Sequence, residues 1–370
     1  MADPVSANQV LDALRPIIDP DFRKSIVDLG FIKNLTIEGP AVSFSIELTT
    51  PACPVKAEFE RAAKERVSAL EGVTEVNVEM TANTRQAART GGGGGEQTVS
   101  LPGVKNIIAV ASGKGGVGKS TTAINLALTL RDQGAEVGIL DADVYGPSLS
   151  LLSGASGRPD TTADRKIMPL HGQGMKLMSM AFFMNDDSPV IWRGPMVHGL
   201  IKQFLTDVQW GELDYLIVDM PPGTGDAALT LTQMAPLSGA VIVTTANDLS
   251  LIDARKGLQM FEKVGVPILG IVENMSYFTP EDAPDKKYYI FGQGGGERVA
   301  KELGVDFLGE VPIDPRIASD GDVGKPIVVS QPDSPSSEAL RTIAGDVVRK
   351  VAMLAVKSPP VADGNITWVN

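Results

Sequence analysis

The stretch VASGKGGVGKST, from Val110 to Thr121, is the most informative part of this 370-residue sequence. Within it, Gly113 to Ser120 matches the pattern G-x-x-x-x-G-K-S, and the match follows the apolar run NIIAVA and precedes the helix-compatible run STTAINLALTLRDQ. In a strand, loop and helix of this order, the loop amides and the helix N-terminus bind phosphate oxygens. The stretch therefore predicts a nucleotide site. It also contains one lysine, Lys114, that the pattern does not require.

Six short runs rich in Val, Ile and Leu follow one another from residue 105 onward, with helical stretches between them. They are NIIAVA, AEVGILDAD, LDYLIVDM, GAVIVTTA, VPILGIVEN and VDFLGEVP. Unbroken apolar runs of this length are typical of strands that are buried on both faces of a parallel sheet. The sequence therefore predicts a doubly wound, mostly parallel α/β fold, in which ligands bind beyond the carboxyl ends of the strands.

A smaller α+β domain is expected before this sheet, over residues 1–82. Ser6 and Gln9 have the spacing of a capping box for a helix through about Leu14, and the runs AVSFSIEL and VTEVNVEM alternate as strands do. Residues 83–104 include five consecutive glycines and predict a flexible linker. Residues 105–357 are then the nucleotide-binding domain, and residues 358–370 form a C-terminal tail.

Composition narrows the class of protein. The net charge of −12 and the pI near 4.8 disfavour nucleic acid as a partner, because nucleic-acid binders usually carry a surplus of Lys and Arg. The chain shows neither a basic leader with an apolar run nor a stretch of about 20 apolar residues, so we expect a cytoplasmic protein that does not bind membranes. Cys53 is the single cysteine, which excludes an intrachain disulfide. With His171 and His198 as the only histidines, a His/Cys zinc site is disfavoured.

The residue types around the phosphate-binding loop suggest their roles. Lys119 is expected to neutralise the β and γ phosphates, and the Ser120 hydroxyl to bind Mg²⁺. Asp219, near the end of the run LDYLIVDM, is expected to hold Mg²⁺ through water, and Asp143 to position the attacking water. Asp141 stays the alternative to Asp143, because the sequence does not show which of the two faces the γ-phosphate. The expected nucleotide contacts are Gly113, Lys114, Gly115, Gly116, Val117, Gly118, Lys119, Ser120 and Thr121.

Further motifs occur in an order that resembles one family. GKGGVGKST, LDADVYGPS, WRGPM, DMPPGTGD, ARKGLQMF, NMSYF and FGQGGGE together look like the Mrp/ApbC family of deviant-Walker-A ATPases, relatives of the MinD/ParA group, over residues 105–350. SIVDLGFI and TTPACPVK resemble the small SufT-like domain of iron-sulfur assembly proteins. The resemblance implies an ATP-hydrolysing homodimer in which Lys114 reaches the partner's nucleotide and stabilises transition-state charge. It also implies that Asn274 reads the adenine, and that iron-sulfur apoproteins or assembly factors are partners.

The chain departs from the family pattern after NMSYF, where cluster-carrying members usually have a C-x-x-C pair. The segment TPEDAPDKK contains no cysteine, and a [4Fe-4S] cluster normally takes four thiolates. Cys53 lies just before a predicted helix, whose N-terminus would lower its thiol pKa. Three readings stay open: a cluster held weakly by Cys53 and small ligands, cluster transfer through Cys53 with a partner, or a loop cysteine without chemistry.

Two functions compete at this point. The leading hypothesis is an ATPase that binds or transfers iron-sulfur clusters, and the alternative is a MinD/ParA-like positioning or scaffold ATPase without its own cluster. A terminal amphipathic helix would favour membrane positioning. The run SSEALRTIAGDVVRKVAMLAVK has helical periodicity, but packing of Leu340, Ile343, Val347 and Val351 in the core explains it more simply.

Overall fold

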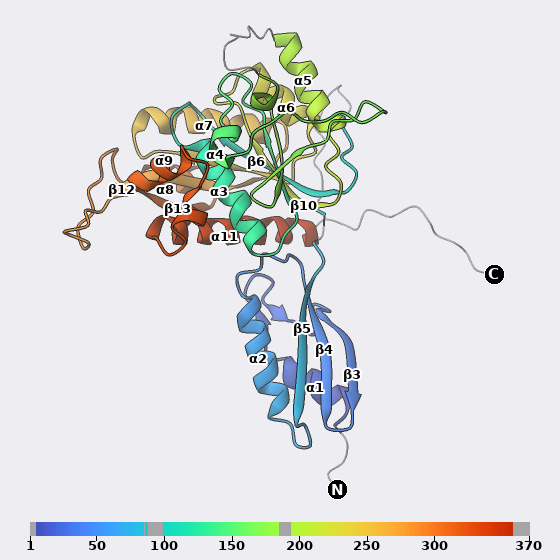
Figure 1. The fold of residues 1–370 in the computed structure, drawn as a ribbon. Helices are drawn as coiled ribbons and strands as arrows, with labels where there is room; N and C mark the ends of the chain where they lie inside the picture. The colour runs from blue at the N-terminus through green and yellow to red at the C-terminus, as the bar shows by residue number, and fades with distance from the viewer. Residues whose placement is uncertain (1–4, 85, 88–98, 185–193, 358–370) are drawn as a thin grey trace.

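Two parts of unequal size make up the molecule, and helix α11 (Pro335–Lys357) lies at the boundary between them (Figure 1). The computed structural model describes residues 5–84, 86–87, 99–184 and 194–357. Most of the expected linker, the expected tail and the WR of the WRGPM motif lie outside the described residues.

The smaller part is a three-stranded sheet with two helices packed against it. The strands run in the order β3-β4-β5, with β3 antiparallel and β5 parallel to β4. Ser6 and Gln9 form the predicted capping box at the start of α1. Alternation along β4 puts Val42, Phe44 and Ile46 on the face that packs against the helices. The elements are α1 (Ala7–Leu14), β1 (Ile18–Asp19), β2 (Lys24–Ser25), β3 (Ile32–Glu38), β4 (Ala41–Leu48), α2 (Lys56–Ser68) and β5 (Glu75–Ala82).

An eight-stranded sheet forms the centre of the larger part. Its order is β13-β12-β11-β6-β10-β7-β9-β8, and every neighbouring pair is parallel except β8 with β9. The six predicted runs are six of these strands, so the doubly wound, mostly parallel fold is confirmed, although β8 and β9 were not predicted. The strands are β6 (Val104–Ser112), β7 (Val137–Asp141), β8 (Leu170–Gly172), β9 (Met175–Ser179), β10 (Leu213–Asp219), β11 (Gly239–Thr244), β12 (Ile268–Phe278) and β13 (Phe307–Ile313).

Helices cover both faces of this sheet and give it two apolar cores. Side chains of α5 (Gly194–Thr206), α6 (Asp226–Met234), α7 (Asp248–Lys263) and α8 (Gly295–Leu303) form the core on one face. The other core contains side chains of α3, α4, α10 and α11, including Leu340, Ile343, Val347 and Val351, as the periodicity of the last helix predicts. The remaining helices are α3 (Lys119–Asp132), α4 (Leu149–Ser153), η1 (Met180–Phe183), α9 (Pro315–Gly321) and α10 (Ile327–Ser330).

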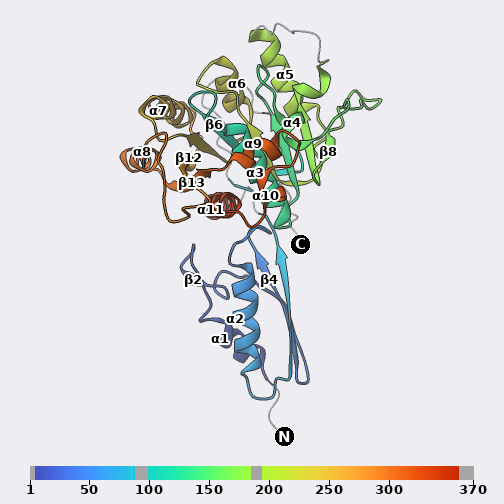
Figure 2. The same cartoon turned by 60° about the vertical axis from the view of Figure 1, so that its left-hand side comes forward.

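The smaller part docks against α11 (Figure 2), and it also bonds to Tyr215 in the amino-terminal half of β10. The Tyr215 hydroxyl donates to Thr50 Oγ1 at 2.8 Å, and Arg349 Nε on α11 forms an ion pair with Asp21 Oδ1 at 3.0 Å. Tyr215 precedes Asp219, the last residue of β10, by four positions, which corresponds to roughly 13 Å along a strand. The docking contact and the carboxyl ends of the strands therefore lie at opposite ends of the sheet.

Candidate nucleotide site and the position of Cys53

The phosphate-binding loop joins β6 to α3 and has open space beside two of its glycines. At Gly118 the backbone is left-handed, with φ +83°, and a Cβ there would lie 2.0 Å from the Asn274 amide nitrogen. A Cβ at Gly113 would lie 2.1 Å from the backbone of Asp253 on α7, so both positions require glycine. A Cβ at Gly115 or Gly116 would meet nothing within 4 Å. That open side is where phosphate oxygens fit.

Lys119 is the first residue of α3 and is only 6% exposed. Its ammonium group contacts Asp219 Oδ1, and lies 3.2 Å from Ser120 Oγ and 4.0 Å from Asp143 Oδ2. Burial raises the pKa of Asp219, and the Lys119 ammonium opposes that rise. The structure thus brings together the four residues that the sequence assigned to phosphate, Mg²⁺ and water. The hydroxyl and the strand-end carboxylate are oxygen ligands of the kind that Mg²⁺ takes, and the ammonium group is a cation that phosphates pair with.

Asp141 and Asp143 occupy different environments. Asp141 is buried, and its two carboxylate oxygens accept hydrogen bonds from the backbone N–H groups of Asp143, Ser148 and Leu149 and from the Ser179 hydroxyl, at 3.0–3.1 Å. Burial raises the pKa of Asp141 to about 7, and the nearby Asp219 carboxylate adds to the rise. Asp143, by contrast, accepts one backbone hydrogen bond, from Gly146, and faces Lys119. Asp141 therefore anchors the loop, whereas the carboxylate of Asp143 is left facing the site.

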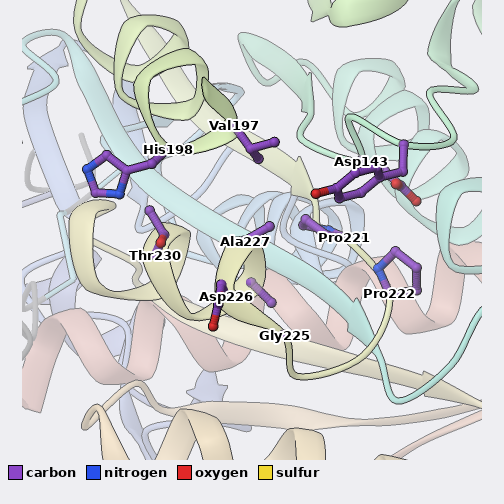
Figure 3. A pocket seen from close by; sticks show the side chains of 11 residues that line it. Asp143, Val197, His198, Pro221, Pro222, Gly225, Asp226, Ala227 and Thr230 are labelled. Carbon is purple, nitrogen blue, oxygen red and sulfur yellow. The ribbon is translucent and has the colours of Figure 1, made fainter. Parts of the chain in front are cut away.

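A cavity of about 800 Å³ lies beside Asp143, between the loops that follow β7 and β10 and the helices α5 and α6 (Figure 3). Its lining includes Tyr145, His198, Pro221, Pro222 and Asp226. The motifs LDADVYGPS and DMPPGTGD mark both loops, but no sequence pattern indicates that α5 packs beside them, so the sequence did not predict the cavity. The cavity opens the site toward solvent on the side of Asp143.

Asn274 lies beside the loop, and Lys114 lies within it. Asn274 on β12 is buried, and its amide nitrogen donates to the Val117 carbonyl at 2.8 Å, which ties the strand to the loop. Its predicted contact with adenine stays a prediction. Lys114 is half-buried, and among the described residues it has no carboxylate within ion-pair distance. Its predicted reach to a second chain stays a prediction too.

Cys53 lies in the docking contact, far from the phosphate-binding loop. Burial raises the pKa of its thiol from 9.0 to about 11, whereas the hydrogen bond with the Val55 backbone opposes the rise. The expectation that the start of α2 would lower this pKa is therefore wrong, because burial of the half-exposed thiol, against the core of the smaller part and beside α11, outweighs the effect of the helix N-terminus. The sequence could not show this, because Arg349 and Ala352, which line the same small cavity, follow Cys53 by about 300 residues. The described residues contain no group of three or more His, Cys, Asp or Glu side chains suited to a metal ion.

The fold and the loop define the class of protein: a P-loop NTPase joined to a small α+β domain. Residues 103–348 match the family described as NUBPL iron-transfer P-loop NTPase, and residues 7–79 match a family described as iron-sulfur cluster assembly protein. The chain belongs to the NUBPL iron-transfer P-loop NTPase family, and the resemblance to Mrp/ApbC and ParA-type proteins is confirmed.

Individual relatives extend over the whole length. The chain is 51% identical to an iron-sulfur cluster carrier protein of Synechocystis over 95% of this chain and 99% of the relative. It is 43% identical to a protein of the same name from Deinococcus radiodurans, over 95% and 97%. A nucleotide-binding protein from Archaeoglobus fulgidus, solved in complex with ADP, is 39% identical and has a TM-score of 0.56 over 64% of this chain and 93% of that one. No helix in the described part of the chain is long and apolar enough to cross a membrane.

Proposed function

We propose that the protein is a Mg²⁺-dependent ATPase that acts as a homodimer and transfers iron-sulfur clusters to apoproteins in the cytoplasm. The observation that carries the proposal is the joining, in one chain, of an assembled phosphate-binding site to a domain that matches iron-sulfur assembly proteins. Near full-length similarity to iron-sulfur cluster carrier proteins supports the choice of cargo.

The roles in hydrolysis follow from the contacts. Lys119 exchanges its contact with Asp219 for the β and γ phosphates, and this exchange frees the Asp219 carboxylate. Mg²⁺, held by the Ser120 hydroxyl and through water by Asp219, would neutralise the charge on the phosphates. Asp143 orients the attacking water, because the oxygens of Asp141 are already occupied by the loop that carries Asp143.

A homodimer fits the surface beside the loop. Gly113 lies against Asp253 on α7, and the same helix exposes Leu249 by 65% and Ile252 by 49%. Exposed apolar side chains beside a site support an interface there. Lys114, without an ion-pair partner in the described part of the chain, would then reach the nucleotide of the partner protomer.

The cargo is taken up through a contact with a partner. One thiol per chain gives a dimer two, fewer than the four that a [4Fe-4S] cluster normally takes, so the chain's own residues do not fit a resident cluster. Cys53 is the one residue that can supply a thiolate to a cluster in transit, and a donor or acceptor protein would complete the ligand set.

Anaerobic reconstitution with iron and sulfide tests this function, for the wild type and Cys53→Ser side by side. We expect the wild type to pass iron to an apo-ferredoxin, which completes the ligand set, when ATP is present. Cys53→Ser should hydrolyse ATP at the wild-type rate, because its ATPase site is untouched. It should pass on no iron, because it lacks the thiolate. Equal transfer by both proteins would contradict a role for Cys53, and absence of ATPase activity in both would contradict the enzyme itself.

A further inference from the structure

The docking contact lies beside the only thiol of the chain, which is half-buried. The cavity beside Cys53 has a volume of about 20 Å³ and is lined from both parts, by Asp21 and Phe22 on one side and by Arg349 and Ala352 of α11 on the other. A space of this size holds about one water molecule. It holds neither an iron-sulfur cluster nor the side chain of a partner protein.

Three contacts fix the smaller part in this place. The Arg349–Asp21 ion pair lies directly at the cavity, and the Tyr215 hydroxyl bonds to Thr50 three residues before Cys53. Ala52 is fully buried in the same core as α3 and α11. The chain on either side of the thiol is thus held against the ATPase part.

Gly345 of α11 lies against the segment that carries the thiol. A Cβ built there would lie 3.6 Å from Pro54 Cβ and Cγ, an ordinary van der Waals contact, whereas any longer side chain would extend into Pro54. Pro54 directly follows Cys53. The helix therefore presents its smallest residue to the segment that carries the thiol.

We propose that this docking is an autoinhibitory latch: while the smaller part lies on α11, the space beside the half-buried Cys53 is too small for a cluster or a partner's side chain, and it opens only when the smaller part leaves α11. The latch rests on the proposed function, since it controls access to the thiol that the proposed function uses. It adds that cluster uptake requires the two parts to separate, and that α11 is the surface from which they separate. The same helix packs on α3, the helix that begins with Lys119.

Alkylation of the full-length protein by iodoacetamide, at one mildly alkaline pH and without iron or nucleotide, tests the latch. Gly345→Leu should wedge the parts apart, and the matched control Gly345→Ala should leave them docked, because its methyl group fits. Return of the Cys53 pKa from about 11 toward 9.0 raises the thiolate fraction by up to about a hundredfold. We expect roughly ten- to hundredfold faster labelling of Gly345→Leu, and the wild-type rate for Gly345→Ala.

A second variant keeps the test independent of the wedge. Arg349→Glu places a like charge beside Asp21 and should also speed labelling. X-ray scattering should show a larger radius of gyration for both variants, with an unchanged far-ultraviolet circular dichroism spectrum. Wild-type labelling rates in both variants would overturn the latch, as would faster labelling that comes with loss of helix signal, since unfolding would then expose the thiol.

The outcome is separable from that of the proposed function. The labelling uses neither iron nor ATP, so faster labelling of the wedge variant supports the latch even where reconstitution shows no transfer. In that case the latch stands and the cargo assigned above is rejected.

Discussion

The two ends of the central sheet handle their reactive groups in opposite ways. At the carboxyl end, Lys119, Asp219 and Asp143 lie close together beside a cavity of about 800 Å³, and Gly115 and Gly116 of the loop border open space. At the amino end, Cys53 faces a cavity of about 20 Å³ and has a raised thiol pKa. One end is ready for a ligand, and the other must change before it can bind one.

The difference has a physical origin. The carboxyl end is assembled by strands of one domain, whose backbone hydrogen bonds fix the register of each strand-end carboxylate. The amino end is a contact between two parts, held by one ion pair and one hydrogen bond at its polar positions. Such contacts within a chain are expected to open more readily than a packed core. We therefore expect the nucleotide site to be rigid, and the contact around Cys53 to be the place where the molecule moves.

The largest predicted effect is that of Lys119→Ala on hydrolysis. Loss of the buried ammonium removes the charge that faces the phosphates, and we expect turnover to fall roughly a thousandfold, as for loss of one preorganised charged donor. The measurement is steady-state ATPase rate together with nucleotide affinity. Lys105→Ala is the matched control, since Lys105 pairs with Asp214 near the opposite end of the sheet and should leave turnover unchanged. Equal rates for both variants would mean that the carboxyl end is not the catalytic site.

Lys114→Ala should have the next largest effect. We expect about a hundredfold slower turnover together with a shift toward monomer in the presence of ATP, because a charge delivered by the partner acts only in the assembled dimer. Turnover measured against protein concentration, with sedimentation of the same samples, checks both parts. Normal turnover of Lys114→Ala would refute the contribution in trans and leave Lys114 as a loop lysine.

The sequence predicted those features that depend on residues close together in the chain. The loop, the six buried strands, the capping box and the apolar face of α11 all follow from residues close in the chain. The distinction between Asp141 and Asp143 did not, because it depends on Ser179 and on backbone N–H groups whose direction only the folded loop defines. The thiol pKa of Cys53 did not either, since its main cause is burial of the thiol in the folded protein. The short β8 and β9 lack a long apolar run and were missed for that reason.

The smallest predicted effect concerns stability and pH at the carboxyl end. The folded protein raises the pKa of Asp141 from 3.8 to about 7, so the folded state binds a proton more tightly than the unfolded state does. The stability from this group is fully present below about pH 4 and is lost as pH rises through 7, by about 1 kcal/mol per pH unit at most. In urea unfolding of the nucleotide-free protein between pH 5 and 8, Asp141→Asn should flatten this slope, whereas Asp143→Asn should retain it. An equal slope in wild type and Asp141→Asn would show that Asp141 stays ionised among its four donors. The ionised Asp141 would then hold the Asp143 loop at every pH tested, and the structure of the carboxyl end would not depend on pH in that range.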